Sequence, residues 1–382
     1  MDRAIRRMWM SAACVFILLM GTLSYIQFFD AQMLMEHKWN TRALYDNYGS
    51  QRGSIVVNGT EIASSVKSND EYNYQRVYSE PEKYAGITGY FSSVYGSTGI
   101  ESALDKELSG TSDSQFYDRV AQLFSGNSTR GASVELTVDD KLQTLAYQLL
   151  QGRKGSIVAM NPKTGEILAM ASSPSYDPNK LAAHNEQSVI ADYTKLTQDQ
   201  QSPLFNRAIA GNTYSPGSTF KIIDAVAALE SGKYDEKSVI DNPAQLPLPG
   251  TNVTLPNFVN GQCATRTQAT IEWALAQSCN TPFANIALDL GQEKISQTAS
   301  KFGYGQDLSI PLKVTKSDFP SDMTKSQLAQ ASVGQYDVKT TPLQVAMTSA
   351  AIANGGVQMK PNLVRSVKTS NLSTLSEFSP EK

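Results

Sequence analysis

The first strongly apolar segment of the chain covers residues 8–29, which contain no charged side chain. Arg3, Arg6 and Arg7 precede this segment. A helix needs about 20 residues to cross a bilayer, so the segment is long enough. A cleaved signal peptide is the alternative, but its apolar part is usually shorter and ends at small residues. We predict an uncleaved transmembrane anchor over 8–29, a cytoplasmic tail over 1–7, and the remaining chain outside the membrane.

The next part of the chain has short apolar stretches in a polar background. Residues 52–66 predict two short strands joined by a hairpin turn at Asn58-Gly59, because this pair favours the positive φ angles of such turns. Residues 116–124 predict a short amphipathic helix, and residues 138–151 predict a clearer one. We therefore expect short strands and short helices before residue 151.

The pattern after this point predicts a more compact unit. Two apolar stretches, 155–160 and 166–172, flank a turn-like loop and predict a hairpin of buried strands. A polar stretch over 175–205 follows. Apolar residues then predict helices over 218–230, 270–277 and 342–354. A turn-rich region lies at 241–262 and an Ala/Leu-rich segment at 283–302. Strands followed by several helices indicate a mixed α/β domain, in which a helical cluster packs against an antiparallel sheet.

Composition limits the classes of protein to consider. The 382 residues are 41% hydrophobic and 18% charged, as in a globular protein of two or three domains. The net charge is −3, and no basic patch argues for nucleic-acid binding. Cys14 lies in the predicted anchor, so Cys263 and Cys279 are the exported cysteines. In an oxidising compartment we predict that these two form a disulfide, with two buried free thiols as the alternative. We predict no metal site, because Cys and His residues are few and scattered.

A Ser-x-x-Lys pattern occurs three times, and the surrounding sequence separates the copies. One copy lies in a polar stretch at 64–67, and another occupies the last four residues, 379–382. Ser218 and Lys221 alone follow a turn signal, YSPG at 214–217, and open an apolar helical run. Unpaired N–H groups and the positive dipole end at a helix start favour a developing anion. This copy is therefore the candidate catalytic pair.

Serine and lysine at this spacing suit nucleophilic catalysis. A serine hydroxyl needs a base to remove its proton, and lysine can serve when burial lowers its pKa toward neutrality. Histidine is the common alternative base, but the chain contains only His37 and His184, both in unsuitable contexts. A Ser-His-Asp triad is therefore disfavoured. The simpler alternative is a capped helix with Lys221 on the surface.

The motif YSPGSTFK, followed by Ser278-Cys279-Asn280, resembles the serine D,D-transpeptidases and β-lactamases, whose signatures are Ser-x-x-Lys, Ser-x-Asn and Lys-Thr-Gly. Another Ser-x-Asn at 125–127 precedes the serine and is predicted to be a loop. Four further stretches narrow the resemblance to the class B penicillin-binding proteins, and it covers essentially the whole chain. These stretches are 52–55, 98–101, 161–179 and 334–346. The short pedestal and the spacing of the exported cysteines most resemble the actinobacterial type.

This resemblance implies an α+β fold with three parts. A transmembrane helix leads to a small, mostly β pedestal domain of the dimerisation type over 30–150. A transpeptidase domain similar to penicillin-binding proteins and β-lactamases follows over 151–382, with an antiparallel sheet and a helical cluster. The protein is expected in the cell membrane, with a single span and its catalytic domain outside the cytoplasm.

The resemblance also implies a reaction, the cross-linking of peptidoglycan stem peptides. Ser218 would attack the penultimate D-Ala carbonyl, release the terminal D-Ala, and pass the acyl group to an amine of a neighbouring stem peptide. Lys221 would activate Ser218, Ser278 would relay the proton, and Asn280 would hold the substrate amide and orient Lys221. Penicillins and other β-lactams would acylate the same serine. No cofactor is implied, and a membrane glycan polymerase of the SEDS family is the expected partner.

Two other functions share these signatures. A β-lactamase uses the same residues but must position a hydrolytic water, and the anchor and pedestal argue against it. A non-catalytic penicillin-binding scaffold or sensor would keep the fold as an interaction module, but the intact set of four polar residues argues against that.

The third signature departs from the family pattern. The only Lys-Thr-Gly is Lys163-Thr164-Gly165, in the early hairpin loop, which is ordinary scaffold in the family. Lys339-Thr340-Thr341 leads into a helix and is no substitute. We therefore expect the functional motif beyond Lys382, a transpeptidase domain that is incomplete at its C-terminus and lacks its closing strands, and no activity in the chain as given.

Overall fold

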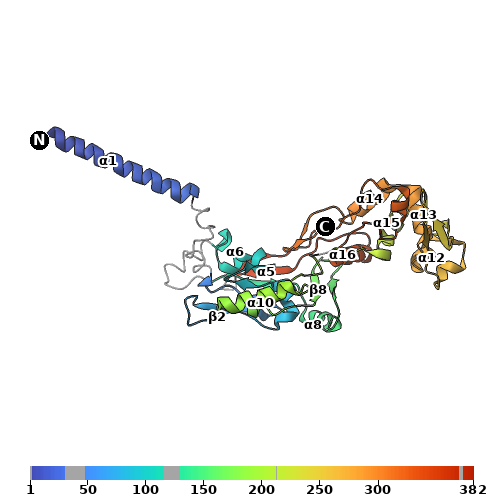
Figure 1. Cartoon of the computed structure of the whole chain (residues 1–382), viewed down its shortest axis with the longest axis horizontal. Coiled ribbons are helices and arrows are strands. Elements are labelled where there is room, and N and C mark those ends of the chain that lie inside the picture. The colour runs from blue at the N-terminus through green and yellow to red at the C-terminus, as the bar shows by residue number, and fades with distance from the viewer. Residues whose placement is uncertain (1, 31–47, 116–129, 212, 370–372) are drawn as a thin grey trace.

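The chain folds into an N-terminal helix, a mixed sheet and a helical cluster, as the computed structural model in Figure 1 shows. The structure describes residues 2–30, 48–115, 130–211, 213–369 and 373–382. The helix predicted at 116–124 and the Ser-x-Asn at 125–127 lie outside these residues.

The N-terminal apolar segment is helical, as predicted. Helix α1 (Asp2–Tyr25) continues into a short π-helical turn, η1 (Ile26–Asp30). It is long and apolar enough to cross a membrane, and its most apolar window is not buried against the rest of the chain. Apolar side chains that the protein itself leaves exposed favour a lipid environment over water. The helix therefore suits a membrane anchor.

A six-stranded sheet in the order β16-β15-β6-β1-β2-β3 combines four strands from residues 55–136 with two strands from residues 364–377. Its strands are β1 (Ile55–Val57), β2 (Thr60–Lys67), β3 (Tyr74–Tyr78), β6 (Ser133–Leu136), β15 (Val364–Lys368) and β16 (Thr374–Glu377). The hairpin between β1 and β2 turns at Asn58 and Gly59, whose φ angles are 48° and 78°. Both values are positive, as the predicted hairpin turn requires.

The last two strands of this sheet lie after residue 354, where the sequence predicted no strand. β15 pairs antiparallel with β6, and β6 pairs parallel with β1. Ser366 in β15 bonds Glu135 in β6 across 231 residues of chain, a pairing that no local pattern can predict. The sheet thus contains strands from both sides of the domain boundary placed at residue 150, and that boundary stays a prediction.

Short elements connect the sheet to the rest of the molecule. They are α4 (Pro81–Thr88), β4 (Phe91–Ser92), β5 (Gly96–Ser97), α5 (Gly99–Ala103), α6 (Asp105–Ser109) and the 3₁₀ turn η2 (Asp113–Gln115). The predicted hairpin of buried strands is confirmed as β7 (Gly155–Met160) and β8 (Ile167–Ser173), which pair antiparallel. Helices α8 (Asp140–Leu149) and α16 (Pro342–Ala353) pack against this hairpin.

A helical cluster, at the right of Figure 1, holds the candidate catalytic residues. Its helices are α11 (Lys221–Glu230), α12 (Ile271–Ala276), α13 (Thr281–Leu290), α14 (Gln292–Lys301) and α15 (Lys325–Ala331). The remaining elements are η3 (Gly217–Phe220), β9 (Val239–Asp241), β10 (Gln245–Pro247), β11 (Thr254–Pro256), η4 (Gln262–Thr265), β12 (Gln268–Thr270), β13 (Leu308–Ser309) and β14 (Lys313–Val314). Sheet, hairpin and helices together form the predicted α+β fold.

Two segments that the sequence analysis described only by their composition contain helices. The Ala/Leu-rich segment at 283–302 forms two helices, because Gly291 adopts a φ of 82° between them. The polar stretch at 175–205 contains α9 (Asn179–Ala182) and α10 (Glu186–Gln198). Helix α10 buries only Val189, so its apolar periodicity is too weak to reveal a helix.

A buried ion cluster lies beside the six-stranded sheet. Glu101 is fully buried, and its carboxylate accepts from Arg52 Nε and Arg76 Nε at 2.6 Å each. Arg52 also contacts Asp105, which is partly exposed, at 2.7 Å. Burial by itself raises the pKa of Glu101, but the charges of Arg76 and Arg52 outweigh it and hold that pKa below its ordinary value. The ionised carboxylate of Glu101, in α5, thus holds together two other elements, the segment before β1 and strand β3.

Glu101→Gln should destabilise the protein strongly, because it leaves two buried guanidinium groups without their counter-charge. Breaking a buried ion pair costs about 3–5 kcal/mol of unfolding free energy. Asp105→Asn is the control, since it removes the partly exposed partner and should cost less than about 1 kcal/mol. Urea denaturation of both variants measures the difference. Equal losses in the two variants would contradict the central place of Glu101 in the cluster.

Candidate active site

Ser218 lies in the turn η3, which leads directly into α11. Gly217 has a φ of 56°, and its N–H donates to Gly334 O at 2.9 Å. A side chain at Gly334 would place its Cβ 2.0 Å from Gly217 O, so this approach requires glycine. Phe220 and Ile223 are buried in the helical cluster, whereas Ser218 is exposed. The turn therefore holds an accessible hydroxyl on a fixed backbone.

Lys221 is fully buried, which excludes the alternative of a surface lysine. Its Nζ lies 3.1 Å from Ser218 Oγ, 3.2 Å from Ser278 Oγ and 2.7 Å from Asn280 Oδ1. Nζ also donates to the backbone carbonyl of Ser278 at 2.6 Å. The four residues singled out in the sequence thus meet at one amino group. Burial lowers the pKa of Lys221 to about 8, and the carboxyl of Asp224 opposes this effect.

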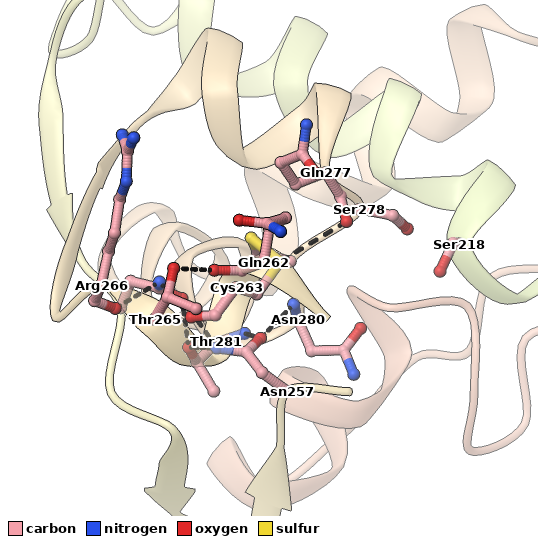
Figure 2. Close-up of a disulfide and its surroundings, with 12 residues drawn as sticks. Ser218, Asn257, Gln262, Cys263, Thr265, Arg266, Gln277, Ser278, Asn280 and Thr281 are labelled. Atoms are coloured by element: carbon pink, nitrogen blue, oxygen red, sulfur yellow. Dashed lines mark hydrogen bonds between the residues drawn. A yellow bond between two sulfur atoms is a disulfide. The ribbon is translucent and has the colours of Figure 1, made fainter. Parts of the chain in front are cut away.

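The Ser-x-Asn motif occupies the connection between α12 and α13, residues 277–280. Ser278 adopts a φ of 57°, a value that is uncommon for residues other than glycine. Because of this turn, Ser278 and Asn280 lie toward Ser218 in Figure 2, while Cys279 between them is fully buried. The motif therefore places its two polar side chains on the accessible side and its cysteine in the core.

Cys279 is joined to Cys263 by a disulfide whose Cα atoms are 5.4 Å apart. Cys263 belongs to η4 and is also buried. Figure 2 shows the bond beside the Ser-x-Asn connection, on the side away from Ser218. The disulfide therefore anchors the residue between Ser278 and Asn280 to the loop that precedes α12.

The sequence analysis did not identify two polar residues that lie close to the four candidate catalytic residues. Asn257 is almost fully buried, and its Oδ1 accepts from Asn280 N at 2.7 Å. Asp224 is fully buried one turn after Lys221, and among the described residues neither of its carboxylate oxygens has a hydrogen-bond partner. Burial raises the pKa of Asp224 well above its ordinary value. A charged residue inside the apolar run of α11 was a visible signal for Asp224, but loop residue Asn257 gave none.

The other motif copies lie elsewhere. Ser64 and Lys67 belong to β2, and the 379–382 copy is in no helix or strand. The Lys-Thr-Gly at 163–165 forms the turn between β7 and β8, where Gly165 has a φ of 81°. Thr341 caps α16, in agreement with the prediction that 339–341 leads into a helix. Within the described part of the chain, no group of three or more His, Cys, Asp or Glu residues could hold a metal ion.

Two domain families match the chain. The penicillin-binding protein transpeptidase domain matches residues 155–382, more than half of the chain. The penicillin-binding protein A dimerisation domain matches residues 52–134. The chain belongs to the class B penicillin-binding proteins. This class B protein is 39% identical over 388 residues to the peptidoglycan D,D-transpeptidase PbpA of Mycolicibacterium smegmatis, covering 100% of this chain and 79% of that relative.

Proteins from Mycobacterium tuberculosis are also similar to this chain, in sequence and in structure. The peptidoglycan D,D-transpeptidase PbpA of strain H37Rv is 37% identical over 382 residues, with 98% of this chain and 77% of the relative covered. Penicillin-binding protein A from M. tuberculosis, solved as a penicillin G acyl-enzyme complex, matches with a TM-score of 0.83 and 36% identity over 87% of this chain and 78% of that chain. Its imipenem acyl-enzyme complex gives a TM-score of 0.85 and 37% identity over 88% and 78% of the two chains.

The disulfide predicts that Cys14 is the single free thiol of the chain. Thiol titration of the denatured, unreduced protein should therefore find one thiol per chain, and Cys14→Ser should find none. Reduction should expose two more in either protein. A closed loop of this length contributes about 3 kcal/mol to the free energy of unfolding in the chain-entropy model, so Cys263→Ser should be less stable than Cys14→Ser. Three thiols without reduction would exclude the bond.

Proposed function

We propose that this class B penicillin-binding protein cross-links peptidoglycan with Ser218 as its nucleophile. Ser218 Oγ attacks the carbonyl carbon of the penultimate D-Ala, the C–N bond to the terminal D-Ala breaks, and an acyl-enzyme forms. An amine of a second stem peptide then attacks the ester and releases Ser218. The observation that carries this proposal is the 3.1 Å contact between an exposed serine hydroxyl and a buried lysine amine. β-Lactams acylate the same hydroxyl.

Lys221 is the base in this proposal. With a pKa near 8, a substantial fraction of the side chain is neutral amine at physiological pH. A neutral amine has two N–H donors and one lone pair. Donation to Asn280 Oδ1 at 2.7 Å and to Ser278 O at 2.6 Å leaves the lone pair for the Ser218 proton. The hydrogen-bond arrangement thus supports proton removal by Lys221.

Ser278 and Asn280 complete the proton path and the substrate contact. Ser278 Oγ lies 3.2 Å from Lys221 Nζ, so it can pass the proton on to the departing amine. Asn280 keeps one N–H of its amide for the substrate, because its Nδ2 donates only to Pro256 O among the described residues. The backbone N–H of Ser218, in the first turn of its helix, is a donor for the oxyanion. Transfer of the acyl group to a peptide amine is favoured over its hydrolysis and over a non-catalytic scaffold, because the similar proteins are D,D-transpeptidases.

The anchor and the domain arrangement extend the proposal to the membrane. The three arginines before the apolar helix favour a cytoplasmic N-terminus and an external catalytic part. Residues 30–150 form the pedestal and residues 151–382 the transpeptidase domain, consistent with family matches at 52–134 and 155–382. The polymer to be cross-linked is made at the same membrane surface, so a SEDS-family glycan polymerase is the proposed partner.

Ser218→Ala should abolish covalent labelling by fluorescent penicillin, because it removes the hydroxyl that the proposal makes the nucleophile, and Ser278 is proposed only to relay the proton. Lys221→Ala should reduce labelling nearly as much, since loss of a general base typically costs about 10²–10⁴-fold in rate. Ser64→Ala is the matched control from another Ser-x-x-Lys copy and should label normally. Gel fluorescence and mass spectrometry of the full-length protein measure the outcome. Normal labelling of Ser218→Ala would refute the assignment.

A further inference from the structure

A buried polar network lies behind Asn280 and fixes its backbone. Asn257 is 3% exposed, and its Oδ1 accepts from Asn280 N at 2.7 Å and from Thr281 N at 3.2 Å. These two N–H groups open α13 and have no partner within the helix. Figure 2 shows the Asn257 side chain next to Asn280 and Thr281. Asn257 thus caps α13 from outside the helix.

The same side chain is held rigidly at its other end. Its Nδ2 donates to three oxygens, Asn242 Oδ1 at 2.7 Å, Thr281 Oγ1 at 2.9 Å and Pro243 O at 3.2 Å. Asn242 is fully buried and donates to the carbonyls of Cys263 at 2.8 Å and Arg266 at 2.7 Å. The orientation of the Asn257 amide is therefore determined on both sides, and its Oδ1 must face α13.

Asn280 would otherwise be expected to cap α13 itself. Asparagine is among the best N-cap residues, and an N-cap normally has an extended backbone with its side-chain oxygen bonded to the helix start. Asn280 instead has φ −87° and ψ −50°, which are helical values, and its side chain makes no cap hydrogen bond. Its Oδ1 accepts from Lys221 Nζ at 2.7 Å, and its Nδ2 donates to Pro256 O at 2.8 Å.

We propose that Asn257 is a positioning residue for the reaction: by capping α13 in place of Asn280, it keeps the Asn280 side chain turned toward Lys221. Without the Asn257 acceptor, the N–H groups of Asn280 and Thr281 lose their partner, and the hydrogen bonds that hold the Asn280 backbone in its helical conformation, not the extended N-cap conformation, are gone. Asn280 Oδ1 would then bond to α13 and leave Lys221. Asn257 touches neither Lys221 nor Ser218 and acts through Asn280. This inference rests on the proposed role of Asn280.

The test compares acylation rates of the full-length protein and its variants with fluorescent penicillin. Asn257→Ala should slow acylation by about 10²-fold, the scale expected when a reacting group is misplaced by about 1 Å. Lys221 also loses an acceptor that favours its ammonium form, so the rising limb of the pH–rate profile should move to lower pH. A purely structural role would lower the melting temperature without moving that limb.

Asn242→Ala is the matched control, because Asn242 is a buried member of the same network without a contact to Asn280. It should lower stability as Asn257→Ala does, yet leave the pH limb in place, because Thr281 Oγ1 and Pro243 O still accept from Asn257 Nδ2 and keep its Oδ1 toward α13. Rates are measured well below the melting temperature of each variant. Asn257→Asp keeps the volume and the acceptor toward α13, so it should acylate faster than Asn257→Ala, but it should lower stability because its second oxygen faces the oxygens that accept from Asn257 Nδ2. If Asn257→Ala does not fold, Asn257→Asp takes its place in the test. A folded Asn257→Asp variant that acylates as slowly as Asn280→Ala would then overturn the proposal.

A double-mutant cycle with Asn280→Ala decides whether the two residues act as one unit. If Asn257 acts through Asn280, the double variant should be no slower than Asn280→Ala. Additive losses of rate in the double variant would overturn the positioning role of Asn257. The same holds if Asn280→Ala is slow while Asn257→Ala keeps the wild-type rate and pH limb. In both cases the proposed role of Asn280 would stand. If Asn280→Ala itself acylates at the wild-type rate, the proposed role of Asn280 fails first.

Discussion

The burial of one amino group, that of Lys221, is the constraint on which the site depends. Water would keep a lysine charged at neutral pH, and a charged lysine cannot accept the serine proton. Removal from water disfavours the ammonium form, while the surrounding oxygens keep the amine hydrogen-bonded. The protein must therefore exclude water from Nζ yet leave Ser218 open to substrate. The turn η3 satisfies both conditions, because it exposes Ser218 and directs Lys221 into the helical cluster.

The oxygens that surround this amine come from a segment 57 to 59 residues further along the chain, so their placement depends on tertiary structure. Helix α11 packs against α13 and α14, which sets the distance between the two motifs. The left-handed backbone at Ser278 then turns two polar side chains toward the amine, and the disulfide at Cys279 anchors that turn. Asp224 adds a buried carboxyl one turn after Lys221 that has no hydrogen-bond partner among the described residues. Burial raises its pKa, and the charge of Lys221 opposes this effect. The protonation of these two groups is therefore linked.

The sequence predicted the part of this site that is local or carried by motifs. The turn before Ser218, the helical run after it and the hairpin at Asn58 each follow from neighbouring residues, and their positions agree with the structure. The break at Gly291 and the helix α10 were missed because one glycine and one buried side chain leave a weak local pattern. The pairing of β15 with β6 and the contact of Asn257 with Asn280 depend on segments that meet only in three dimensions. Those features required the structure.

The pH dependence of acylation tests the central claim, that Lys221 is a buried amine whose neutral form activates Ser218. The second-order rate constant for β-lactam acylation of the full-length protein is measured from about pH 6.5 to about pH 10.4. The upper limit is the ordinary pKa of lysine. Because burial lowers the pKa of Lys221 to about 8, the rate should rise with pH and become constant above that value. A rate that continues to rise to the upper end of this range, or one that does not respond to pH while the protein stays folded, would contradict the claim.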